Sequence, residues 1–173
     1  MNTHNYNPLA QKQKPLRPKL DDIIIDALEG VSLKNAIDFS AFLKMLKSNP
    51  TWASANSWKV SYKGQVVCYI KLHGSNAFNL EKGSWQVGVH LNYEDAHPDI
   101  ISDESLVQTL WDNVKYCYRC SNCRGGDKIL FGKEFKDVCH GPVVFINPDS
   151  KALECVKRLI AIKRQEISDV RKT

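Results

Sequence analysis

The stretch Trp58-Lys-Val-Ser-Tyr-Lys-Gly-Gln-Val-Val-Cys-Tyr-Ile-Lys-Leu72 decides the fold of this chain. Its first half alternates apolar and polar side chains, which is the pattern of a half-buried strand. Gly64-Gln65 then supplies a turn, and the run from Val66 to Leu72 is rich in β-branched and aromatic residues. The stretch therefore predicts an antiparallel β-hairpin.

The register of this hairpin determines which side chains share a face. A two-residue turn at Gly64-Gln65 would place Tyr62 opposite Val67 and Val60 opposite Tyr69. Trp58, Tyr62 and Tyr69 would then lie on one face, and apolar residues would also occupy the other face.

Two alternatives follow for the second apolar face. Either helices and the cysteine-containing hairpin cover it, or it stays open as a cleft for a small apolar or aromatic ligand. The second alternative makes Trp58, Tyr62 and Tyr69 the candidate ligand-binding residues. His90 belongs to the polar face of its strand, where a lone histidine usually faces solvent, so we do not select it as a catalytic base.

Further strands are predicted on the C-terminal side of the first hairpin. Residues 77–80 and 85–91 predict a second hairpin, residues 128–131 and 134–139 a third, and residues 143–146 a buried strand. Four or more antiparallel strands are the economical assignment.

Helical periodicity and capping signals frame these strands. They predict helices over 21–28, from Ser32 to residue 48, and from Ser102 or Asp103 to residue 114. A C-terminal helix is expected to begin with Asn147 as N-cap and Pro148 at its first position. The predicted fold class is thus α+β: an antiparallel sheet of four or more strands built from hairpins and packed by N-terminal, central and C-terminal helices.

The domain organisation is simple. Residues 1–19 contain three prolines and four basic residues but no acidic one, which predicts a flexible basic tail rather than a folded element. Residues 20–173 are expected to form a single α+β domain, because 173 residues suffice for one core.

The composition limits the protein's location and partners. The N-terminus lacks an apolar signal region and no segment is long and apolar enough to cross a membrane, so we expect a cytoplasmic protein without a membrane partner. Six cysteines in a reducing compartment are better interpreted as thiols or metal ligands than as disulfides. The net charge of +5 is too modest to indicate a dedicated nucleic-acid binder. The sequence does not indicate an oligomeric state.

The most specific motif is Cys117-Tyr-Arg-Cys120-Ser-Asn-Cys123, followed by Gly125-Gly126 and, across the third hairpin, by Cys139. Two thiolates separated by two residues can bind one ion when the backbone between them folds into a tight turn. We therefore predict a cysteine-rich knuckle over 117–140 that holds structural zinc through Cys117, Cys120, Cys123 and Cys139.

Alternatives to this ligand set remain. Cys117 also falls on the apolar stripe of the preceding helix, so it could be a buried thiol with His140 as the fourth ligand. Reduced unligated thiols, a redox or disulfide role, and an iron–sulfur cluster are the competing interpretations; the last lacks the proline that follows the final cysteine in ferredoxin-type motifs.

The chain also resembles known families in its layout. The helical lead-in, the hairpin from Trp58 to Ile70, and Asn147-Pro-Asp followed by the helix containing Cys155-Val-Lys-Arg-Leu-Ile-Ala-Ile-Lys-Arg164 are similar to small bacterial YdhG-like and GyrI-like domains. The resemblance covers roughly residues 20–167. It implies an α+β domain and, from the GyrI-like group, small-molecule binding in a sheet-lined cleft. The cysteine motif and the lack of a helix-turn-helix depart from that pattern, so no site residue is transferred.

Three functions compete at this stage. The first is a small-molecule-binding or accessory domain with a structural zinc knuckle. The second is a nucleic-acid or protein interaction module that uses the basic tail, the basic face of the C-terminal helix, Arg119 and Arg124. The third is an enzyme built on Cys139 and His140 or on His90, which is disfavoured because adjacent strand residues point to opposite faces.

Overall fold

A five-stranded antiparallel sheet forms the centre of the computed structural model, which describes residues 7–75, 80–93, 98–117 and 125–170. The strands occur in the order β1-β2-β3-β4-β8. Together with the surrounding helices this sheet confirms the predicted α+β class. Its strands are β1 (Thr51–Ser54), β2 (Ser57–Tyr62), β3 (Gln65–Leu72), β4 (Trp85–Val89) and β8 (Phe145–Ile146).

The β2–β3 hairpin forms as predicted, but its register differs. The turn consists of Lys63 and Gly64, both with positive φ (47° and 81°), and Tyr62 pairs with Gln65. The register then shifts between Val60 and Ser61, because a β-bulge on β3 places an extra residue there.

This bulge overturns the predicted face of Tyr69. Val60 pairs with Cys68 instead of Tyr69, and Tyr69 pairs with Lys59. Because side chains alternate along a strand, one inserted residue moves all following side chains to the opposite face. Trp58 and Tyr69 therefore lie on opposite faces of the sheet.

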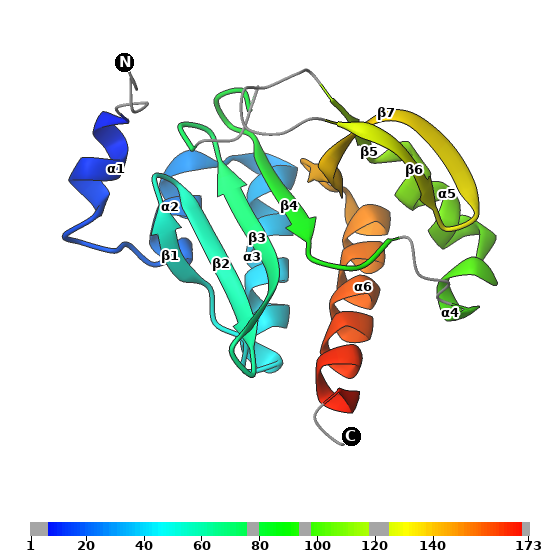
Figure 1. The fold of residues 1–173 in the computed structure, drawn as a ribbon. Helices are drawn as coiled ribbons and strands as arrows, with labels where there is room; N and C mark the ends of the chain where they lie inside the picture. Colours follow the sequence, from blue (N-terminus) through cyan, green and yellow to red (C-terminus); the bar gives the residue numbers. More distant parts are fainter. Residues whose placement is uncertain (1–6, 76–79, 94–97, 118–124, 171–173) are drawn as a thin grey trace, which may run out of the picture.

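Among the described helices, three lie on one face of this sheet (Figure 1). They are α2 (Leu20–Ala27), α3 (Gly30–Met45) and α6 (Ser150–Asp169). Phe39 of α3 packs against Trp85, with ring centroids 6.1 Å apart. The covered face contains the main core, which includes the buried side chains of Trp58, Val60, Cys68, Ile70, Leu72, Val87 and Phe145.

A second sheet lies beside the first one. Its order is β5-β7-β6, with β5 (Val114–Tyr116), β7 (Lys133–Val143) and β6 (Gly126–Leu130). The predicted third hairpin corresponds to β6 and β7.

Two helices precede this sheet, α4 (Pro98–Ile101) and α5 (Glu104–Asp112). Asp103 caps α5 by accepting a hydrogen bond from Leu106 N at 3.0 Å. The indole of Trp111 donates to the Leu130 carbonyl at 3.0 Å and so ties α5 to β6.

The structure of residues 7–19 differs from the predicted flexible tail, because part of this segment is helical. Residues Pro8–Gln13 form helix α1, capped by Asn7, and Gln13 is buried. A six-residue helix is too short to be stable alone, so its side-chain contacts with the sheet hold it in place. Gln13 supplies them: Nε2 donates to Asn56 Oδ1 at 2.7 Å, and Oε1 accepts from Asn56 N at 2.8 Å and from Trp52 Nε1 at 3.3 Å.

Other boundaries differ by a few residues. The C-terminal helix begins at Ser150, and its N-cap is Asp149, which accepts from Ala152 N at 2.8 Å, rather than Asn147. Asn147 instead joins β4 by accepting a hydrogen bond from Trp85 N at 3.0 Å. In the described residues, none of the helices has the length and apolar character needed to cross a membrane.

Candidate anion-binding cleft

A cleft of about 630 Å³ lies where the first sheet meets the second. The end of β4 and the segment after it form one wall, residues of β6 and β7 form the other, and α6 contributes Lys163. Its polar lining includes His90, Lys128, His140 and Lys163, and none of the described lining residues is acidic. The described lining thus carries basic side chains and no carboxylate, although Lys163 is paired with Glu166 just outside it.

His90 follows β4 directly and is held in place by backbone and ring contacts. Its N–H donates to the Val67 carbonyl at 2.7 Å, and its ring centroid lies 5.2 Å from that of Tyr69. Desolvation lowers the pKa of His90, and the positive charges of Lys163 and His140 lower it further. The neighbouring positive charges thus oppose protonation of the imidazole, and the same charges would attract a bound anion.

Lys163 projects from α6 towards the same cleft. Its Nζ lies 3.1 Å from Glu166 Oε2, one helical turn away, so a neighbouring carboxylate orients it. Both side chains are largely shielded from solvent, which strengthens their interaction relative to a fully exposed pair.

Tyr93 forms the rigid floor of the cleft. This buried side chain donates a hydrogen bond from its hydroxyl to the Val89 carbonyl at 2.8 Å. Its ring meets Phe131 edge to face, with centroids 5.8 Å apart, and the Phe131 N–H donates to the Tyr93 carbonyl at 3.3 Å. These contacts join the two sheets at this point.

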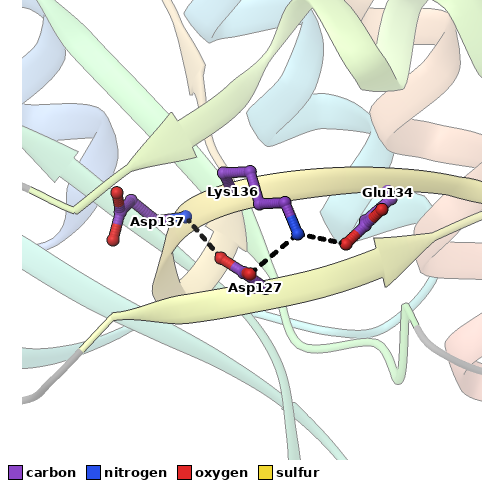
Figure 2. A network of polar contacts seen from close by, with 4 residues as sticks. All are labelled: Asp127, Glu134, Lys136 and Asp137. Carbon is purple, nitrogen blue, oxygen red and sulfur yellow. Dashed lines mark hydrogen bonds and ion pairs between the residues drawn. The ribbon is translucent and has the colours of Figure 1, made fainter.

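A surface network stabilises the hairpin that supplies Lys128 and His140 (Figure 2). Lys136 Nζ contacts both Asp127, at 2.9 Å, and Glu134, and Asp127 also accepts from the Asp137 N–H at 3.2 Å. The hydrogen bond from Lys136 lowers the pKa of Asp127. Because these groups are exposed, we assign them a role in fixing the β6–β7 pairing rather than a large contribution to stability.

The aromatic residues selected from the sequence are not brought together. Trp58 is fully buried, and its indole donates to the Pro18 carbonyl at 2.8 Å, so it belongs to the core. Tyr62 lines a separate groove of about 570 Å³ beside α6, where the Arg164 guanidinium lies 4.2 Å from its ring centroid. Tyr69 lies on the other face of the sheet, next to His90.

The cysteine motif is only partly described. Cys120 and Cys123 lie outside the described residues. Cys117 follows β5 and Cys139 lies in β7, and both are half-buried. Within the described ranges, no group of three or more His, Cys, Asp or Glu side chains is placed to hold a metal ion.

Both flanks of the motif are fixed to β7. Cys117 N donates to the Asp137 carbonyl at 2.6 Å, and Gly126 pairs with Val138, the residue before Cys139. A Cβ on Gly125 would lie 2.2 Å from Cys117 Cβ, so only glycine permits this close approach.

No protein-family model, curated protein or solved structure matches this chain. The site must therefore be interpreted from its own geometry.

The sequence contained one unused charge pattern, which concerns the first sheet and contributes only Gln65 and Val66 to the cleft. Between Asp38 and Glu81 there is no acidic residue, and lysine is the only residue type with a full charge. This segregation predicts an electropositive side of the sheet. It does not identify Lys128, His140 or Lys163, which come from a different sheet and from a helix.

Proposed function

We propose that this protein is a binding domain for a small anionic ligand, such as a carboxylate or a phosphate, held in the cleft between the two sheets. The observation that carries the proposal is the gathering of His90, Lys128, His140 and Lys163 around a cavity of about 630 Å³ with no acidic residue in its described lining. Pockets of this size commonly hold small ligands, and convergent polar groups fix their orientation.

The chemistry of the ligand differs from the apolar or aromatic one that the sequence favours. Trp58 is part of the buried core and cannot contact a ligand, and the bulge in β3 turns Tyr69 to the other face of the sheet. Two lysines, two histidines and the amides of Gln65 and Asn92 form the polar part of the cavity. Lys–phosphate and Lys–carboxylate contacts are strong because they are charge-assisted.

Thermal denaturation with inorganic phosphate and with citrate tests this function. A ligand at a hundred times its Kd stabilises the folded state by about 2.7 kcal/mol. For a chain of this size that corresponds to a rise in Tm of roughly 5–10 °C. We expect Lys163→Gln and His140→Gln each to reduce the rise.

The matched control is Lys151→Gln, which removes an exposed charge from the start of the same helix. It should retain the full ligand-dependent rise. An equal rise in sodium chloride at the same ionic strength, or an equal loss in the control, would contradict a specific anion site.

We also propose a structural zinc ion bound by Cys120, Cys123, Cys139 and either Cys117 or His140. The support is that both flanks of the motif are fixed to β7 within one or two residues of Cys139. Elemental analysis of protein purified without chelator should give about one zinc per chain, and Cys120→Ser or Cys123→Ser should abolish binding.

Cys155→Ala is the control for this metal proposal. Cys155 is buried in α6, so its loss should leave the zinc content unchanged. A zinc content near zero, with the thiols of the unfolded protein all titratable, would refute the proposal.

A further inference from the structure

The face of the first sheet turned away from α2 and α3 borders the cleft, because the Tyr69 ring lies next to His90. In the view of Figure 1, no described helix or strand lies in front of β2 and β3. Cross-strand pairing places Tyr69 on this face between Lys59 and Gly88, and Lys71 between Ser57 and Gln86. Ser57 and Gln86 are buried and Lys71 is half-buried, so the face is accessible mainly at Lys59 and Tyr69 and closes towards Lys71. We call the set Lys59, Tyr69, Lys71 and Gly88 the open face.

The charge of the open face is of one sign. Strands β1 to β4 contain no acidic residue. In the described part of the chain, no carboxylate forms an ion pair with Lys59, Lys71 or the neighbouring Lys115 of β5. The pKa of Lys71 is lowered by burial and by the charge of Lys115, so these two ammonium groups repel each other. An anion that approached both would relieve this repulsion.

Tyr69 supplies a flat apolar surface among these cations. It is half-exposed, and its neighbour across the ladder is Gly88, which has no side chain to cover it. A Cβ added to Gly88 would meet Val144 and the Val143 carbonyl, at 3.9 and 4.0 Å, so residues 143 and 144 approach the face at Gly88. On the other side of Tyr69, Lys59 is exposed, so a planar group could lie beside the Tyr69 ring from that side.

These features together indicate a specific ligand class. Aromatic side chains that stack on bases, combined with lysines that contact phosphates, are typical of single-stranded nucleic-acid binding. A duplex would not suit this surface, because its bases are stacked on one another and cannot reach a tyrosine on a sheet. We propose that the open face binds single-stranded nucleic acid, with a base stacked on Tyr69 and phosphates held by Lys59, Lys71 and Lys115. This site borders the anion cleft at Tyr69 and His90 but uses different lysines.

Fluorescence anisotropy with labelled 12-nucleotide oligo(dT) and oligo(rU), from 50 to 200 mM salt, tests this binding. Tyr69→Ala should weaken it on the order of tenfold, because a stacked base is lost, whereas Tyr69→Phe should retain it. Lys59→Gln and Lys71→Gln should each reduce the salt slope of log K by about 0.7, the value for one phosphate contact on a single strand.

Controls separate this surface from general electrostatics and from the cleft. Lys34→Gln removes an exposed charge from α3, on the opposite side of the sheet, and should leave affinity and salt slope unchanged. Lys163→Gln should weaken phosphate binding in the cleft but not oligonucleotide binding. The proposal is overturned if neither oligonucleotide binds at 50 mM salt, or if a duplex of equal length binds as tightly. Equal weakening by Lys34→Gln, or an unchanged affinity in Tyr69→Ala, would overturn it as well.

Discussion

Single side chains in the core show how burial controls chemical reactivity. Cys68 is fully buried in β3, and Cys155 is buried in α6. Burial raises the pKa of both thiols, that of Cys155 to about 12. Since the thiolate is the nucleophile, these two residues should be inert in the folded protein.

We therefore predict that Cys68 and Cys155 remain unlabelled by a thiol reagent at pH 8 until the protein unfolds. Peptide mass mapping after timed labelling measures this directly, and the labelling rate should follow the unfolding rate as urea is added. Rapid modification of Cys155 in the native protein would contradict the burial described for α6.

Among the secondary-structure elements, α1 is attached by side-chain hydrogen bonds from two residues, Asn7 to the Gly74 carbonyl and Gln13 to the β1–β2 region. The buried Gln13 makes three hydrogen bonds to the β1–β2 region. Gln13→Ala would leave the indole N–H of Trp52 and the backbone N–H of Asn56 without this acceptor, at a cost of about 1–3 kcal/mol.

The expected effect of Gln13→Ala is local. Hydrogen exchange over residues 8–16 should become faster, while protection of β2 and β3 stays unchanged. The control is Lys12→Ala on the exposed side of the same helix, which should keep the exchange rates of the original protein. Global loss of protection in Gln13→Ala would show that α1 belongs to the main cooperative unit instead.

The strands and helices also show what a sequence can predict. Alternation identified β2 and β3, and the Asp103 cap identified the start of α5. The bulge in β3 has no glycine or other local marker, so the face of Tyr69 could not be predicted. Similarly, α1 is stabilised by contacts with residues more than thirty-five positions away, and local composition cannot indicate such contacts.

For the whole molecule, the charge around the cleft affects stability as a function of pH. The pKa of His90 is lower in the folded protein than in the unfolded chain. Between these two pKa values the unfolded chain binds more protons, so the free energy of unfolding rises with pH. The resulting loss of folding stability is complete at pH values below the pKa of His90 in the folded protein. It is absent well above the pKa of His90 in the unfolded chain, which is about 6.5.

Urea unfolding at a series of pH values between 5 and 8 checks this prediction. Stability should decrease as the pH falls through this range, and His90→Gln should reduce the decrease. Lys163→Gln should reduce it partially, because it removes one of the charges that oppose protonation of His90. An unchanged pH dependence in both variants would assign the effect to other groups.

The candidate cleft was harder to predict than the strands and helices, because its residues are far apart in the sequence and meet only in the folded protein. His90 follows β4, His140 lies on β7 and Lys163 on α6. Only the packing of two sheets and a helix brings them together, and no spacing in the sequence encodes that packing.

The order of strands in the first sheet has one more consequence. β4 and β8 are antiparallel neighbours, although the whole second sheet and α5 lie between them in the chain. Topologically, that intervening segment is an insertion into a β-hairpin, since it leaves and re-enters the sheet at adjacent strands. Such a module can be gained, lost or exchanged without altering the order of the remaining strands. One wall of the cleft comes from the insertion, whereas Lys59, Tyr69 and Lys71 lie on strands outside it. The cleft could therefore change during evolution while these three residues of the open face are kept.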